Sequence, residues 1–228
     1  MNLNLRLVRL YVKNRNKLRG ILYKNPVLSL GLALPFAVVC SNSLKNAAIM
    51  SICMFITLIP TMMIASLVGK RIPPALYFVV YPIIASFILI PAILLATPLS
   101  SNAEDSLGFY LQILSVNSLL IYSIRPCVRI KPGKAFAYSS MNCVGFALVM
   151  FCLAFFRELL GNGTLWGIPV SFSAHVYGLL FPFAGFILVG FFAALMRTVN
   201  RKIYHLLLHI EKNRTEDRRV LEAVRSMQ

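Results

Sequence analysis

Charged residues are scarce in this chain of 228 residues: Asp, Glu, Lys and Arg together make up 13%, about half of the share found in soluble domains. Hydrophobic residues make up 58%, and the mean hydropathy is +0.75. This leaves too little polar surface to cover a water-soluble globule. The composition therefore excludes a soluble enzyme, a disordered chain and a secreted disulfide scaffold, and it indicates a polytopic membrane protein.

Acidic residues are the rarest charged type, with 7 Asp and Glu against 23 Lys and Arg and a formal net charge of +16. In a soluble protein this excess would suggest nucleic acid as a partner. Here the basic residues lie in the gaps between apolar runs, which membrane topology explains more simply. We therefore expect no nucleic-acid partner.

Motifs for metal or catalytic chemistry are also missing. The five cysteines, at positions 40, 53, 127, 143 and 152, form no Cys-x-x-Cys pair, which argues against a disulfide framework and an ordinary zinc site. The sequence has no phosphate-binding Walker loop, no Gly-x-Gly-x-x-Gly motif and no carboxylate inside an apolar run that offers a proton relay. His205 and His209 are four residues apart, but an exposed helix face is the simpler interpretation.

Six apolar runs approach the length needed to cross about 30 Å of hydrocarbon. The first is short, and the fourth is unusually polar. We therefore predict an all-α integral membrane protein with six transmembrane helices and no separate soluble domain. The predicted spans are residues 26–41, 47–68, 75–96, 107–124, 135–156 and 176–196.

The basic residues predict the orientation of these spans. Counted between the runs, 21 Lys and Arg fall on one side and only Lys45 and Arg157 on the other, which by the positive-inside rule places both termini in the cytoplasm. The evenly spread basic residues of 1–25 do not resemble a cleavable signal and predict a basic amphipathic helix on the anionic inner leaflet. We expect residues 26–197 to form the membrane domain and 198–228 a cytoplasmic amphipathic helix, in a prokaryotic inner membrane.

Glycine or polar residues interrupt the first and fourth predicted spans. Gly31 and Pro35 lie in the first; Gln112, Ser115, Asn117 and Ser118 lie in the fourth. Since each interrupted span precedes two long ones, the chain divides into three-span repeats, about 26–96 and 107–196, of opposite orientation. Such inverted repeats place broken helices near the middle of the bilayer. Asn117 is the best candidate for a buried polar function, although an interhelical hydrogen bond is favoured over it.

At the end of the fifth predicted span, residues 157–165 read Arg-Glu-Leu-Leu-Gly-Asn-Gly-Thr-Leu. Gly161 is suited to a left-handed helix cap, and Gly163 to a tight turn. Arg157 and Glu158 are opposite charges at a membrane boundary that can compensate one another and contact other loops. The simplest interpretation is a helix end with an interfacial ion pair.

This stretch resembles the Arg-Glu-x-x-Gly-x-Gly-x-Leu signature of the Rnf/Nqr membrane subunits. Asn-Pro-Val-Leu at residues 25–28 and Leu-Gly-Leu at 30–32 resemble the start of their first span, and Ala-Phe-Ala at 135–137 matches a piece that opens their fifth. The resemblance covers roughly residues 20–200. Cytoplasmic termini suit the E subunit of the Rnf electron-transport complex, or the D subunit of the sodium-translocating NADH:quinone oxidoreductase Nqr, better than the A subunit of Rnf.

The resemblance implies a fold of six helices in two inverted repeats. It also implies that the partner is a homologous membrane subunit, and that one cysteine from the first and one from the fourth span of each subunit hold a shared 2Fe–2S cluster. Electrons would pass through this cluster, and their passage would be coupled to sodium or proton movement. Four cysteine ligands are what such a cluster needs.

This chain departs from the family at both implied ligand positions, where Ala33 and Ser118 replace cysteine. Alanine has no ligating atom, and a serine hydroxyl is a hard donor poorly matched to iron–sulfur chemistry. Cys40 lies seven residues past Ala33, about 10 Å along a helix. We therefore expect no cofactor on the cysteines of this chain. Any redox role of Cys40 or Cys127 stays open.

Two classes of function follow from the sequence. The first is a membrane subunit of an Rnf/Nqr-like ion-translocating electron-transport complex, at most a non-catalytic subunit of that translocase, with a structural or divergent role. A scaffold or assembly factor is a variant of this first class and differs from it only in whether the mature complex retains the chain. The second is a small-solute transporter or the substrate-binding subunit of an importer. The signature at residues 157–165 and the paired broken spans favour the first.

Overall fold

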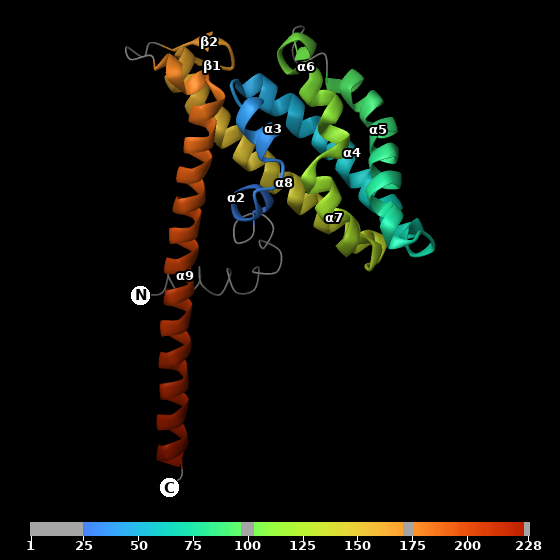
Figure 1. Ribbon diagram of the computed structural model, residues 1–228. Coiled ribbons are helices and arrows are strands. Elements are labelled where there is room, and N and C mark those ends of the chain that lie inside the picture. The colour runs from blue at the N-terminus through green and yellow to red at the C-terminus, as the bar shows by residue number, and fades with distance from the viewer. Residues whose placement is uncertain (1–24, 97–102, 171–175, 226–228) are drawn as a thin grey trace.

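The computed structural model describes residues 25–96, 103–170 and 176–225. The helix expected over residues 1–25 lies almost entirely outside this part. The described chain is helical apart from its connections and one short hairpin, so the predicted all-α membrane fold is confirmed (Figure 1). Its elements are α2 Pro26–Leu30, α3 Leu34–Val39, α4 Leu44–Val68, η2 Gly69–Arg71, η3 Pro74–Leu76, α5 Tyr77–Ala96, α6 Ala103–Ile113, η5 Leu114–Val116, α7 Ser118–Val128, α8 Pro132–Arg157, η6 Glu158–Asn162, β1 Thr164–Leu165, β2 Ile168–Pro169, η7 Tyr177–Leu180 and α9 Pro182–Arg225.

Five helical segments of the described chain are long and apolar enough to cross a membrane: Leu44–Arg71, Pro74–Ala96, Leu107–Val128, Pro132–Asn162 and Pro182–Lys202. They correspond to the second to sixth predicted spans. The first predicted span is absent from this set because it breaks into α2 and α3, of five and six residues. The fourth is interrupted as well, at η5. The inverted relation of the two halves stays a prediction.

Two long helices, α4 and α8, form the centre of the molecule. They pack against each other more extensively than any other pair. Three methionines of α4, Met50, Met54 and Met62, are fully buried in the core. The unbranched methionine side chain is well suited to filling irregular space between helices. The broken helices lie on either side of this pair, with α7 against α4 and α2 and α3 against α8 (Figure 1).

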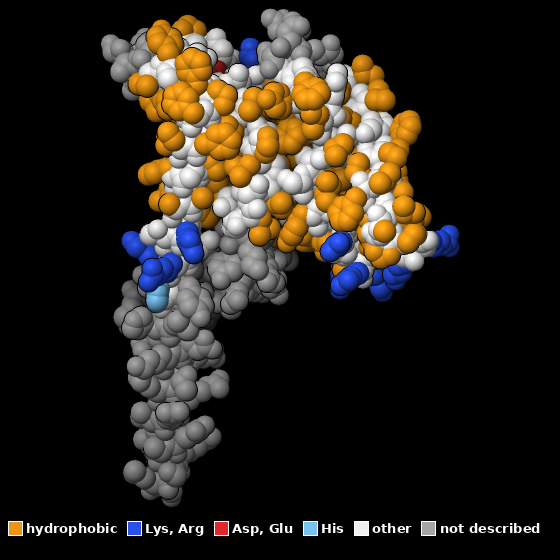
Figure 2. Space-filling view, viewed as in Figure 1, with side chains coloured by type: hydrophobic (Ala, Val, Ile, Leu, Met, Phe, Trp, Pro, Cys, Tyr) orange, Lys and Arg blue, Asp and Glu red, His pale blue; other side chains and the backbone are white. Residues whose placement is uncertain are grey.

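The outer helices α5 and α9 expose large apolar side chains. On α5 these include Phe87, Ile90 and Leu94, each more than half exposed, and α9 has a similar surface at Ile187 and Phe191. Figure 2 shows this apolar surface with basic side chains gathered at one end of it. A contiguous apolar band bordered by cations is typical of a protein surrounded by lipid.

Helix α9 runs without interruption from Pro182 to Arg225 and extends far beyond the other helices (Figure 1). Residues 198–225 therefore continue the sixth span as one helix. Within the bundle α9 contacts α2, α3 and η7 more than α8. It packs tightly against α3 at Gly185, where an added Cβ would lie 2.9 Å from Val38 Cγ1 and 3.1 Å from the Val38 carbonyl oxygen.

We predict that Gly69→Ala destabilises the protein. Gly69 follows α4, and a Cβ atom there would lie 2.5 Å from Val128 Cγ2 and 2.8 Å from the Tyr81 hydroxyl. Since overpacking of this kind costs about 1–3 kcal/mol, the thermal unfolding midpoint in detergent should fall. The matched control is Gly133→Ala, where nothing lies within 4 Å of the added atom. Equal midpoints for the two variants would contradict this packing.

Candidate functional site

The break between α2 and α3 results from two residues in left-handed backbone conformations. Helix α2 begins with Pro26 behind Asn25, whose side-chain oxygen accepts hydrogen bonds from the backbone N–H groups of Val27 at 2.9 Å and Leu28 at 3.1 Å. It ends at Gly31, where φ is 67°. Ala33 then adopts φ 54° as the N-cap of α3. Non-glycine residues seldom adopt this conformation, so the surrounding structure must hold Ala33 in place.

The break in the fourth span is closed by Asn117. Its backbone is extended between η5 and α7, and its side-chain oxygen accepts the N–H of Leu120 at 2.8 Å. Its amide nitrogen donates to the Leu114 carbonyl and lies 3.6 Å from the Met54 sulfur on α4. Asn117 therefore satisfies the backbone groups that the break frees, and it also contacts α4. The choice between an interhelical hydrogen bond and a buried polar function for Asn117 stays a prediction.

The two breaks meet at the positions that the resemblance assigns to cluster ligands. The backbone N–H of Ala33 donates a hydrogen bond of 2.8 Å to the Ser118 hydroxyl oxygen. Ala33 is completely buried, whereas Ser118 is exposed. The sequence therefore identified two residues, 85 positions apart, that are in direct contact. What it missed is that Ser118 binds the backbone of the other break.

The residues at this junction do not fit a 2Fe–2S cluster. Ala33 offers no donor atom, and the Ser118 oxygen already accepts the Ala33 N–H. Cys40 ends α3 and Cys127 lies near the end of α7, so both are at the far ends of their helices. In the described part of the chain, no three His, Cys, Asp or Glu side chains are grouped to hold a metal ion.

Much of the junction is open to the surface of the single chain. Gly31, Pro35, Val116 and Ser118 are exposed, and Val116 shows 53% of its surface. Backbone that departs from a helix cannot face lipid, because its polar groups would lack partners there. In a bilayer this surface would therefore face other protein or a water-filled cavity. Asn25 anchors the same region internally, since its amide nitrogen donates to the Gly145 carbonyl of α8 at 2.8 Å.

Arg157 holds two separate segments together at the end of α8. It is only 1% exposed, and it donates to the Val38 carbonyl and, at 2.9 Å, to the Ser41 hydroxyl. It also donates to two carbonyls of η7, those of Leu179 at 2.9 Å and Leu180 at 2.7 Å. The cation thus lies at the carbonyl end of α3, where the helix dipole favours positive charge. No signal in the sequence pointed to these carbonyl partners.

Glu158 binds the opposite kind of helix end. Its carboxylate accepts the N–H of Leu44, the first residue of α4, at 2.6 Å. Its other oxygen accepts the N–H of Gly167 at 2.8 Å and the Thr164 hydroxyl at 3.2 Å, both in the β1–β2 hairpin. Arg157 and Glu158 are therefore neighbours in sequence that bind different segments. The expected ion pair is replaced by two matched contacts, one at each side of the α3–α4 turn.

The two glycines of the signature have different backbone conformations. Gly163, at φ 66°, is the left-handed cap, and its N–H donates to the Glu158 carbonyl. Gly161 lies inside the π-helical turn η6, where a Cβ atom would lie 2.8 Å from Leu180 Cδ2. The prediction of Gly161 as the left-handed cap was wrong, because the wider π turn carries the helix further along the chain. Gly161 is instead the place where η7 packs onto η6.

We predict that Arg157→Met strongly destabilises the protein. The substitution leaves four acceptors, three carbonyls and the Ser41 hydroxyl, without their common donor. Since each buried acceptor left unpaired costs about 1–3 kcal/mol, the loss should exceed about 3 kcal/mol. Arg157→Lys should retain part of this stability. A lysine ammonium is a compact group and cannot donate to α3 and η7 at the same time, as the planar guanidinium does.

The measurement for Arg157 is thermal or denaturant unfolding of the purified chain in mild detergent. The matched control is Arg197→Met, because Arg197 is exposed on α9, and exposed substitutions usually change stability by less than about 0.5 kcal/mol. If both variants had the same unfolding midpoint as the unmodified protein, Arg157 would not hold α3 and η7 together.

Comparison with known proteins agrees with this geometry. A family model described as "Rnf-Nqr subunit, membrane protein" matches residues 15–196. The chain is similar to the E subunit of the proton-translocating ferredoxin:NAD(+) oxidoreductase complex of Clostridium ljungdahlii, with 24% identity over 198 residues, 85% of this chain and 89% of that one. It is also similar to the D subunit of the Na(+)-translocating NADH-quinone reductase of Pseudoalteromonas translucida, with 26% identity over 190 residues, 79% of this chain and 90% of that one.

A third relative is the E subunit of the Na(+)-translocating ferredoxin:NAD(+) oxidoreductase complex of Acetobacterium woodii. It is 24% identical over 201 residues, which cover 82% of this chain and 97% of that one. The three relatives are thus matched along nearly their whole length. The resemblance noted at residues 157–165 is therefore confirmed across the membrane domain.

Proposed function

We propose that this chain, which belongs to the Rnf-Nqr family of membrane subunits, supplies no iron–sulfur ligand of its own to the ion-translocating electron-transport complex in which it serves. The relatives named above are subunits of such complexes. One observation carries the proposal. At the junction of the two breaks, where the family places thiolates, this chain has Ala33 and Ser118, and the backbone N–H of Ala33 donates a hydrogen bond to the Ser118 hydroxyl oxygen.

The partner we propose is a homologous membrane subunit that covers the exposed junction. The surface around Gly31 and Val116 contains irregular backbone that lipid cannot satisfy. A homologous subunit has its own pair of broken helices, and these would lie at the same depth in the bilayer. In this arrangement the Ala33–Ser118 contact fixes the register of the two broken helices without a cluster, so the chain acts as a structural half of the pair.

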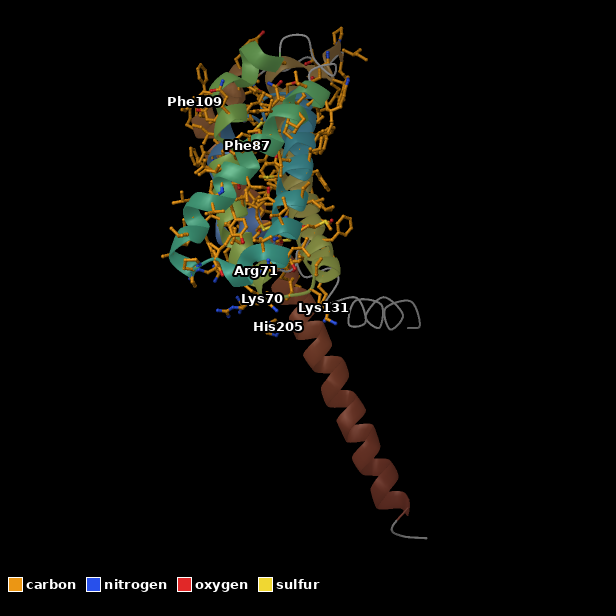
Figure 3. All side chains as sticks on the ribbon, turned by 90° about the vertical axis from the view of Figure 1, so that its right-hand side faces the viewer. Lys70, Arg71, Phe87, Phe109, Lys131 and His205 are labelled. Atoms are coloured by element: carbon orange, nitrogen blue, oxygen red, sulfur yellow. The ribbon has the colours of Figure 1, made fainter. Side chains whose placement is uncertain are left out.

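The membrane we propose is the prokaryotic inner membrane, with both termini in the cytoplasm. Lys70, Arg71 and Lys131 lie at the same end of the molecule as His205 of α9 (Figure 3). This end holds the basic loops on which the positive-inside rule rests. Arg157 and the β1–β2 hairpin would then lie at the extracytoplasmic side.

We predict that iron in the purified complex does not depend on any cysteine of this chain. Each cysteine is replaced in turn by alanine, and iron analysis and visible absorption are compared after anaerobic isolation in mild detergent. Because no three of these side chains are grouped in the described part of the chain, each variant should keep the iron of the unmodified complex. Loss of iron in Cys40→Ala or Cys127→Ala would refute the proposal, since the ligands would then have moved.

The matched variant for this experiment combines Ala33→Cys and Ser118→Cys, which restores the thiols implied by the family. If the partner subunit retains its own two cysteines, this variant should gain iron and visible absorption. Iron that is unchanged in every variant would place all clusters in other subunits. A chain recovered as a stable monomer, with no partner subunit, would contradict the proposed pairing directly.

We also predict the sidedness of two sites. A single cysteine introduced at Lys131 should react with a membrane-impermeant maleimide only in inside-out vesicles, and one at Trp166 only in right-side-out cells. Trp166 suits this test because it is exposed at the hairpin turn. The five native cysteines are first replaced by alanine, and the background of that parent protein is subtracted. The reverse pattern of labelling would overturn the proposed orientation.

A further inference from the structure

Six basic side chains form a rim at one end of the bundle. They come from the connection between α4 and α5, from the last turn of α7 with the connection that follows it, and from the first turn of α8, and all six are exposed. Figure 3 shows three of them at this end, below the apolar flank that includes Phe87. We call this set the basic rim: Lys70, Arg71, Arg125, Arg129, Lys131 and Lys134.

The basic rim has no counter-charge among the side chains that the structure describes. Glu158 is the one carboxylate in that set, and it binds the start of α4 and the β1–β2 hairpin at the opposite end. Like charges gathered at one end repel one another and raise the local potential. A ligand that brings negative charge to this end would therefore bind favourably.

Arg125 connects the rim to the lipid-facing surface. Its guanidinium carbon lies 5.5 Å from the centre of the Phe78 ring, a cation–π distance. Phe78 is 45% exposed at the start of α5, and Val79 and Ile83 on the same helix are more than half exposed. The guanidinium is thus held against the apolar flank and does not extend freely into water. Stacking uses the face of the group and leaves the N–H donors at its edge for an anion.

We propose that the seam between α5 and α7, at Arg125 and Phe78, binds the phosphate of an anionic phospholipid of the adjoining leaflet. The phosphate accepts from the Arg125 guanidinium with neighbouring rim cations as support, and an acyl chain lies along the exposed side chains of α5. A lipid satisfies both halves of this seam, the cation and the apolar flank. An acidic soluble protein would satisfy the cations alone, because it cannot reach below the membrane surface.

The inference does not depend on the proposed function and is tested on the full chain. The protein is extracted into detergent with equal amounts of phosphatidylglycerol and phosphatidylcholine, and the retained lipid is measured by native mass spectrometry. We expect phosphatidylglycerol to be enriched, and Arg125→Gln to lower its retention about fivefold, since one basic residue near an anionic surface contributes about 1 kcal/mol. Phe78→Leu should also lower it, because the stacking that orients the guanidinium is lost.

The matched control is Lys45→Gln, which removes one charge at the other end of the molecule. Unfolding midpoints identify any variant that fails to fold, and Phe78→Leu replaces Arg125→Gln in that event. Equal phosphatidylglycerol retention in Arg125→Gln and Lys45→Gln would overturn the proposal. It would also be overturned if Arg125→Gln kept its lipid but lost an acidic cytoplasmic partner protein, because the rim would then be a protein-docking surface.

Discussion

The backbone hydrogen bonds of two interrupted helices are the constraint on which this structure depends. In a hydrocarbon environment a free N–H or carbonyl has no water to bind, so each interruption needs its own polar partners from the protein. Asn25 and Asn117 satisfy the groups within each break. Ser118 joins one break to the other through the Ala33 N–H. The short helices α2, α3 and α7 then pack against the central helices α4 and α8.

The Arg-Glu pair extends the same principle to the end of the bundle. The turn between α3 and α4 brings a helix carbonyl end and a helix N–H end close together. Arg157 matches the first and Glu158 the second, so each charge meets the dipole of opposite sign. The order of the two residues suits this turn, since exchanging them would place the carboxylate at the carbonyl end of α3 and the cation at the N–H end of α4. In this chain, the Arg-Glu pair of the signature therefore stabilises the α3–α4 turn and the β1–β2 hairpin.

Hydropathy and charge were sufficient to predict the long elements. The runs at 47–68 and 75–96 agree with α4 and α5 to within a few residues, because every long helix in lipid must be apolar over its length. The local signals of Gly31 and Asn117 also located the breaks. The errors lie where tertiary contacts decide. The sixth span was predicted from residue 176, but η7 occupies Tyr177–Leu180, and Arg157 binds its carbonyls. Gly161 was misassigned since a π turn leaves no periodic trace in sequence.

Helix α9 has a mechanical consequence. Its 44 residues make a rod of about 66 Å, and no loop separates the part within the bundle from the part beyond it. Since an uninterrupted helix does not bend sharply without a proline or a bulge, any tilt of its membrane end must sweep the distal end through a larger arc. Gly185, pressed against Val38, lies near the proximal end of this rod. A displacement of α3 too small to disturb the bundle would therefore be magnified at the far tip.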